Sequence, residues 1–437
     1  MTTPSLTTTA TAATPSRDAS RARIAVSVLF FTNGALIANL LPRYPQIKAD
    51  LDLTNAAFGT AVAAYPVGAL IAGLSAGLLI RRFHSSRVAV AATLVAAVGI
   101  LLTGIAPGWL VLALALFLAG AMDAIADVAQ NSHGLRVQRL YGRSIINSFH
   151  AVWSVGAVTG GAMGAVAAQL EVPLLVHLSL SGVLLGIAAV LAYRWLLPGA
   201  EPVAADAAAD VAGAGAAADA AAPTSAADAS VAQDEAIVDA GVARGSSPQA
   251  LGLVARYSVL LALVVIASVG AIVEDSGSSW SAIYLSDSLG TSAFVAGLGF
   301  ISLQGMQFVG RLLGDRMTDR FGQRAVARSG GVLVVVGLGA ALAFPSVIGT
   351  IVGFGVAGFG VATLIPSAMQ NADEIPGFRP GTGLTIIGWL LRVGFLVSPP
   401  LIGAIADATA LRYGLLIVPA SGLLVILFAR VLSRRGR

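Results

Sequence analysis

The sequence predicts an all-α membrane protein of twelve transmembrane helices in two six-helix halves. Hydrophobic residues make up 57% of the 437 residues and charged residues only 11%, and the mean hydropathy is +0.85. A soluble domain has about 25% charged residues, so these values exclude an ordinary water-exposed surface around one core. Backbone groups in lipid must pair internally, and the apolar runs lack the alternation of a barrel, so helix is the secondary structure that fits them.

The uncharged windows of the sequence are each long enough for one bilayer crossing, which takes roughly 20 residues as a helix. They predict spans at residues 24–42, 57–80, 88–106, 110–131, 145–168, 173–196, 256–280, 292–312, 327–345, 347–370, 382–406 and 411–430.

The composition changes at two places along the chain. Residues 1–20 are polar and rich in Thr, Ala and Ser, which predicts a disordered cytoplasmic tail before an uncleaved first helix. Residues 198–250 are Ala-rich and acidic, which predicts a disordered cytoplasmic linker. The spans therefore divide into an N-terminal half at 21–197 and a C-terminal half at 251–437, which also repeat weakly: Gln130-Asn131 corresponds to Gln370-Asn371.

The positions of the basic residues predict the orientation in the membrane. With the N-terminus inside, Arg43, Lys48 and Arg412 face outside and Arg392 lies within a span, while the rest of the 26 Lys and Arg residues are cytoplasmic. This positive-inside pattern predicts that both termini are cytoplasmic. It also explains the net charge of +4, so no nucleic-acid partner is expected. The chain has no cysteine, which excludes disulfides and Cys-based metal sites.

Two stretches carry a resemblance to a known family. Residues 314–324, Gly-Asp-Arg-Met-Thr-Asp-Arg-Phe-Gly-Gln-Arg, resemble the loop signature of the major facilitator superfamily, and the resemblance extends over nearly the whole chain. The matching loop of the first half has Arg81 in place of the family aspartate and His84 in place of the glycine. The resemblance implies the major facilitator fold and an asymmetric cytoplasmic gate. Its expected gating residues are Gly314, Asp319 and Arg320.

Three further stretches, at 127–154, 274–285 and 394–403, are similar to one largely uncharacterised bacterial branch of that superfamily, related to fucose permease. In that branch an acid often precedes the tryptophan, whereas here Ser279 precedes Trp280. The resemblance implies a small polar solute as substrate, with a sugar as one option.

Polar side chains inside the spans are the candidate functional residues, because a charge near the bilayer centre costs at least ~2.5–3.5 kcal/mol and should face a cavity or a partner. The resemblance implies that spans 1, 4, 7 and 10 line the cavity, and three of these carry unusual polar groups. The candidates for substrate binding or proton coupling are Asn33, Asp123, Asp127, His150, Glu274, Asp275, Trp280, Gln304 and Arg392. We expect Glu274 and Asp123 to be protonated in part of a cycle or paired with Arg392.

Each candidate also has a structural interpretation. Asp127 is either functional, with His150 level with it, or a structural partner of Arg136 or Arg143. Arg392, the one base expected in mid-membrane, neutralises an acid, holds an anionic substrate or forms a structural ion pair. Trp280 forms either an outer rim over the substrate or part of an interfacial belt.

Two motif matches predict packing rather than chemistry. Residues 73–77 match a nucleophile elbow and residues 353–358 a dinucleotide fingerprint, but both lie inside apolar helices without the strand that each motif requires. The four-residue spacing of Gly156, Gly160 and Gly164 likewise predicts close helix packing.

Together these observations predict a secondary active transporter in the bacterial inner membrane that works by alternating access, with proton-coupled uptake of a small polar solute. No nucleotide-binding signature is present, and no cofactor or metal is expected; the chain is expected to act as a monomer and not as an enzyme. Two alternatives stay open: a proton-coupled exporter of drugs or metabolites, and a non-transporting membrane sensor or scaffold.

Overall fold

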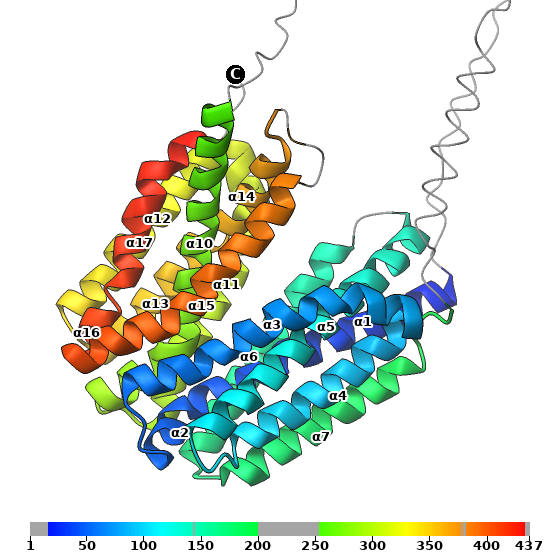
Figure 1. Cartoon of the computed structure of the whole chain (residues 1–437), viewed down its shortest axis with the longest axis horizontal. Coiled ribbons are helices and arrows are strands. Elements are labelled where there is room, and N and C mark those ends of the chain that lie inside the picture. The colour runs from blue at the N-terminus through cyan, green and yellow to red at the C-terminus, as the bar shows by residue number, and fades with distance from the viewer. Residues whose placement is uncertain (1–15, 143–144, 200–252, 377, 379–381, 433–437) are drawn as a thin grey trace, which may run out of the picture.

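The computed structural model describes residues 16–142, 145–199, 253–376, 378 and 382–432. Most of the predicted tail and linker lies outside these ranges. Within them, twelve helical spans are long and apolar enough to cross a membrane. The predicted all-α fold of twelve transmembrane helices is therefore confirmed, and Figure 1 shows its two bundles, one from each half of the chain.

The N-terminal bundle contains the first six spans. Its elements are α1 (Arg17–Leu40), the 3-10 turn η1 (Leu41–Arg43), α2 (Tyr44–Asp50), α3 (Asn55–Phe83), α4 (Ser85–Thr103), α5 (Trp109–Tyr141), α6 (Ile146–Gln169) and α7 (Leu174–Tyr193). The prediction of a tail to residue 20 is wrong at its end, because α1 begins at Arg17. The hydroxyl of Ser16 accepts a hydrogen bond from the Ala19 N–H at 3.1 Å and caps the helix there.

The C-terminal bundle repeats this plan. Its elements are α10 (Leu253–Ile283), the π-helical turn η2 (Tyr284–Ser288), α11 (Ala293–Phe321), α12 (Gln323–Ala343), α13 (Val347–Val361), α14 (Leu364–Asp373), α15 (Thr382–Ala408), α16 (Leu411–Gly414), α17 (Ile417–Phe428) and the 3-10 turn η3 (Ala429–Val431). Helix α11 continues ten residues beyond Arg311, or about 15 Å at 1.5 Å per residue. Arg311, expected on the cytoplasmic side, therefore lies within a spanning helix.

Glycines bring helices of one bundle into backbone contact. A Cβ at Gly156, Gly160 or Gly164 of α6 would collide with the backbone carbonyl oxygens of Phe31, Ala35 and Asn39 of α1, respectively. The predicted packing role of this glycine series is confirmed. The 353–358 stretch packs in the same way, since a Cβ at Gly358 of α13 would meet the carbonyl oxygen of Leu303 in α11. Residues 73–77 lie inside α3, so neither motif match follows the strand that its chemistry requires.

The two bundles touch through α3 with α15 and α6 with α11. We call the end of the molecule where α1 and α10 begin the terminal end, and the opposite end the distal end. Figure 1 shows the bundles meeting near α2 and α16, at the distal end, and diverging toward the terminal end.

Polar contacts close the distal end. The Asp407 carboxylate at the end of α15 accepts hydrogen bonds from the backbone N–H groups of Asn55 (2.9 Å) and Ala56 (2.8 Å), and so caps α3 of the other bundle. Lys48 of α2 pairs with Asp287 of η2 at 3.3 Å. A Cβ at Gly59 of α3 would collide with the carbonyl oxygen of Pro399 in α15. The structure is therefore closed at its distal end, and the backbones of the two bundles diverge toward its terminal end (Figure 1).

Candidate functional site

A hydrogen-bonded chain of side chains crosses the N-terminal bundle. The indole N–H of Trp153 in α6 donates to Asn33 Oδ1 in α1 at 2.8 Å, and Asn33 Nδ2 donates to Asp123 Oδ1 in α5 at 2.7 Å. The Tyr65 hydroxyl of α3 also bonds Asp123. Four helices thus converge on one carboxylate. Because the indole fixes which way the Asn33 amide points, the orientation of Asp123 is set by three other spans.

Asp127 lies one turn further along α5, where its side chain is exposed between the bundles. Its Oδ1 accepts hydrogen bonds from Asn131 (2.9 Å) and Gln130 (3.3 Å), and it interacts electrostatically with His150 and Arg392. The structural alternative of a pair with Arg136 is wrong, since that guanidinium donates to the carbonyls of Pro198 (2.5 Å) and Gly199 (3.1 Å). Arg143 lies outside the described residues.

Glu274 is a carboxylate of α10 in the C-terminal bundle, and its neighbour Arg311 acts electrostatically on His150 of the N-terminal bundle. Gln307 Nε2 donates to its Oε2 at 2.9 Å, and Arg311 Nη2 lies 3.7 Å from the same oxygen. Of the two alternatives expected for Glu274, pairing with Arg392 is wrong, and protonation in part of a cycle stays a prediction. Its base comes from α11, where Gln307 and Arg311 lie four residues apart on one helix face. Gln304, one turn earlier, is buried.

Arg392 reaches from α15 toward the N-terminal bundle. Its Nη1 would lie 3.7 Å from a Cβ at Gly73 in α3, and its charge acts on Asp127. Among the described residues it forms no salt bridge, so it is neither a structural ion pair nor a partner of Glu274 here. A second base on a spanning helix, Arg311 of α11, belongs to this site and lies 3.7 Å from Glu274.

Trp280 belongs to the contact between the two bundles at the distal end, which we call the distal seam. It is fully buried, and its ring stands edge-on to Phe58 of α3 at 6.0 Å, while Phe58 packs edge-on against Tyr44 of α2 at 5.1 Å. A fully buried ring contradicts the alternative of a belt at the membrane–water interface. The aromatic group Tyr44–Phe58–Trp280 instead joins the two bundles on the distal side of Glu274.

The expected gating residues lie at the terminal end of α11. Gly314 is buried, and a Cβ there would approach Thr363 Cγ2 to 2.7 Å, so it allows close packing against the α13–α14 junction. Asp319 and Arg320 are exposed, and the Arg320 guanidinium lies 5.4 Å from the ring of its neighbour Phe321. Within the described ranges, no ion pair reaches Asp319. The bundles diverge at this end of the molecule (Figure 1), so an Asp319 without an ion pair fits a gate that is not closed.

We predict that Asp319→Asn lowers the population of the state in which the distal end is open, by roughly two- to fivefold, the effect of losing one charge near a helix terminus. The reason is that Asp319 can hold the terminal end closed only as an anion. A single cysteine at Ala165, buried at the distal seam, reports the change as slower maleimide labelling in this cysteine-free chain. Asp315→Asn, an exposed acid on the same helix, is the matched control. Equal labelling of the Asp319→Asn and Asp315→Asn proteins would show that Asp319 has no gating role.

The sequence analysis missed several residues of this site. Trp153, Tyr65, Gln307 and Arg311 hold the carboxylates and were not among the candidates. A signal for two of them was present: Gln304, Gln307 and Arg311 form a polar stripe at helical spacing in an otherwise apolar span. The other two residues, Trp153 and Tyr65, gave no comparable signal in the sequence. Within the described residues, no group of three His, Asp or Glu side chains is placed to hold a metal ion.

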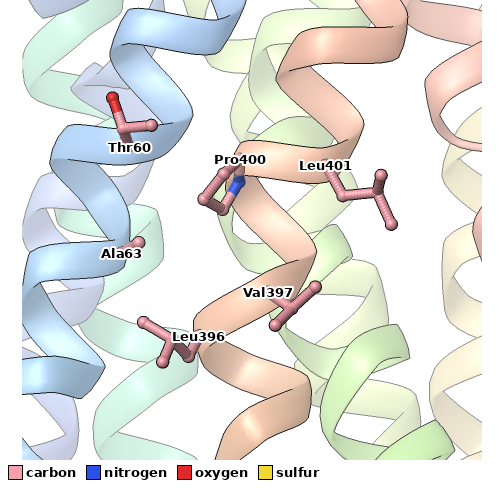
Figure 2. Close-up of a pocket in the computed structure, with 6 residues that line it drawn as sticks. All are labelled: Thr60, Ala63, Leu396, Val397, Pro400 and Leu401. Atoms are coloured by element: carbon pink, nitrogen blue, oxygen red, sulfur yellow. The ribbon is translucent and has the colours of Figure 1, made fainter.

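A shallow apolar hollow of about 500 Å³ lies apart from this site, between α3 and α15. Figure 2 shows its lining by Thr60, Ala63, Leu396, Val397, Pro400 and Leu401. Val397 and Leu401 are exposed on the outer surface of the bundle. The hollow contains none of the charged candidates, so we assign it to the lipid-facing seam between the bundles.

Twelve apolar spans in two bundles, with charged and amide side chains facing each other between them, define a membrane transport protein of the secondary class. The family model "Major Facilitator Superfamily" matches residues 26–317 and 275–437, and the chain belongs to this superfamily of transporters.

Relatives and solved structures agree with this assignment. The chain is 28% identical over 409 residues to the uncharacterized transporter y4wD of Sinorhizobium fredii, covering 94% of this chain and 97% of that protein. A crystal structure of the nucleoside transporter NupG matches with a TM-score of 0.66 at 13% identity, over 95% of this chain and 99% of that one. A D-xylose-proton symporter matches with a TM-score of 0.66 at 16% identity, over 94% and 96%. At these low sequence identities, the two structural similarities establish the fold alone.

Proposed function

We propose that this transporter moves a small polar solute into the cell by alternating access, with uptake driven by protons. The observation that carries the proposal is that each bundle holds one oriented carboxylate, Asp123 or Glu274, and that charged groups of the two bundles act on each other across the space between them. Each is held by an amide donor, at 2.7 Å from Asn33 and at 2.9 Å from Gln307. A solute bound between them contacts both bundles, which is the requirement for a site that alternating access exposes to either side.

The chemistry of this space favours a solute rich in hydroxyl groups, such as a sugar. No hydrogen bond from the described residues reaches Glu274 Oε1, so this oxygen is free to accept one from a solute. The amides of Gln304 and Asn131 add donors and acceptors, and the indole of Trp153 offers an apolar ring face. The relation to the fucose permease branch is part of this proposal and rests on the sequence resemblance.

The orientation is proposed from the charge bias of the loops. If the basic residues are cytoplasmic, the terminal end faces the cytoplasm and the described conformation is inward-open. Closure of the terminal end and opening of the distal seam then give the outward-open state. In this scheme Asp127 and His150, which interact with each other within the N-terminal bundle, change their surroundings between the two states.

The test is a binding screen followed by transport. Purified protein is heated with pentoses, hexoses, nucleosides, organic acids and drugs; a solute at 100 times its Kd stabilises the folded state by about 2.7 kcal/mol. Each stabilising solute is then measured in proteoliposomes, by counterflow and by accumulation under an inward proton gradient. We expect a sugar or similar polyol to show all three responses.

The outcome also separates the rival functions. Accumulation that requires the opposite gradient direction identifies an exporter. Stabilisation without counterflow for every solute of the panel identifies a sensor or scaffold and overturns the proposal. Protein-free liposomes and Asp52→Asn, a change in an exposed distal loop, serve as controls.

A further inference from the structure

We propose that Asp275, together with Ser279 and Ser398, binds the coupling cation as H⁺ or Na⁺. Asp275 follows Glu274 in α10, so its side chain is turned by about 100° from that acid. It faces Ser398 of α15, which lies beside the carboxylate, and Ser279 Oγ lies 3.4 Å from Asp275 Oδ1. The inference rests on the proposed function, since only a gradient-driven transporter has a coupling site.

The first argument is that Asp275 is half-buried, with its Oδ2 atom buried, and that it lacks a compensating charge. Its Oδ2 has no access to solvent and receives no hydrogen bond within the described residues. Its ionisable neighbours are Glu274 on the same helix and Tyr44 of the other bundle, and neither supplies positive charge. Glu274, by contrast, has Arg311 at 3.7 Å. An uncompensated buried carboxylate is unfavourable, so Asp275 requires a cation that the protein does not supply.

The second argument is the set of oxygen atoms around it. Ser276, Ser279 and Ser398 are all buried, and the hydroxyls of Ser276 and Ser398 lie 3.1 Å apart. A carboxylate and hydroxyl groups are oxygen donors of the kind that hard cations prefer.

The third argument is position. Asp275 interacts electrostatically with Tyr44, which belongs to the aromatic group Tyr44–Phe58–Trp280 that joins the two bundles at the distal end. Opening the distal end moves α2 and α3 away from α10, and this removes the cover from Asp275 on that side. A cation bound there is therefore enclosed in the described conformation and released or loaded from the distal side in the other. Occupancy of the site and the state of the bundles are linked in this way.

Cation binding is testable without knowing the solute. The purified full-length chain and Asp275→Asn are compared in NaCl and in choline chloride of equal ionic strength, by thermal unfolding and by infrared spectroscopy. Sodium binding predicts a higher unfolding temperature in NaCl for the parent protein only. Proton binding predicts a protonated carboxylic acid band in the parent protein that is lost in Asp275→Asn. Asp52→Asn, the same change at an exposed position, should keep the parent behaviour.

The variant is expected to fold, because replacing a buried charge by a neutral group of the same size removes a desolvation penalty. If Asp275→Asn retains whichever of the two responses the parent protein shows, or if the parent protein shows neither, the cation site is overturned.

The coupling role is tested in proteoliposomes with the solute found by the screen. Asp275→Asn should retain counterflow, which needs no net cation movement, and lose gradient-driven accumulation by at least tenfold. Full accumulation by this variant overturns the coupling role while leaving the proposed function intact. A parent protein that shows neither counterflow nor accumulation overturns the proposed function itself, and the coupling role with it, whatever cation binding shows.

Discussion

Replacing Gly59 by leucine is expected to hold the distal end of the transporter open and to stop net transport. A Cβ at this position would collide with the carbonyl oxygen of Pro399 and lie 3.1 Å from the nitrogen of Pro400, both in the other bundle. Overpacking of this kind costs about 1–3 kcal/mol, which corresponds to a ~5- to ~150-fold shift of the equilibrium between the two states. The clash disappears when the bundles separate, so the shift favours the open distal end.

Labelling of a single cysteine at Ala165 measures this shift. Ala165 is fully buried, and a Cβ at Gly297 of the opposite bundle would lie 2.6 Å from the Cβ of Ala165. Maleimide labelling at this position should therefore rise in the Gly59→Leu protein. Counterflow should fall at the same time, because the cycle cannot pass through the closed state.

Two glycines provide matched controls for the same substitution. A Cβ at Gly305 of α11 meets nothing within 4 Å, so Gly305→Leu should label and transport like the parent protein. At Gly156 the collision is with α1 of the same bundle, so Gly156→Leu should lower the amount of folded protein instead. A folded Gly59→Leu protein with unchanged labelling and counterflow would show that the α3–α15 contact does not control the distal end.

Asp123→Asn is expected to weaken solute binding by at least tenfold. The carboxylate receives hydrogen bonds from Asn33 at 2.7 Å and from Tyr65. Asparagine has one acceptor oxygen and one donor NH₂. Its NH₂ group would take the place of a carboxylate oxygen beside the donors Asn33 and Tyr65, so the side chain at 123 would lose its orientation. Loss of a hydrogen bond to a charged group costs about 1.5–3 kcal/mol, which is a tenfold or larger change in Kd.

The measurement is the Kd for the solute found by the screen, from thermal shift and from the concentration dependence of counterflow. The unfolding temperature without solute shows whether the variant is folded, and Asp52→Asn is the chemical control. Asn33→Asp, which removes the donor to Asp123 and places two acids together, should weaken binding as well. If folded Asp123→Asn binds the solute with the parent Kd, the carboxylate has no part in the site.

The sequence predicted individual polar residues of the site better than their partners. Asn33 and Asp123 were both candidates, and the structure joins them directly. Asp127 and His150 were expected at one level, and they interact. Pairing of Glu274 with Arg392, one of its two expected alternatives, is wrong, because the base beside it is Arg311, which the charge pattern places with the cytoplasmic residues.

Arg43 shows the same difficulty at the distal end. Counted among the outward-facing charges, it is 1% exposed and donates from Nη2 to the carbonyl oxygen of Val172 at 2.6 Å. Charge statistics place a residue on one side of the membrane but do not show whether the chain folds over it. The loop between α6 and α7 covers this guanidinium, and only the packing of that loop reveals it.

The sequence by itself determined the twelve spans, the division into two halves and the polar residues that lie within the spans. These follow from hydropathy, charge and motif spacing, which are local properties that the bilayer imposes on each segment separately. The tertiary structure decided which side chains meet, which end is closed and which acid lacks a base. Those depend on how each helix is rotated and how closely it packs, and the glycine contacts that set both join residues far apart in the chain.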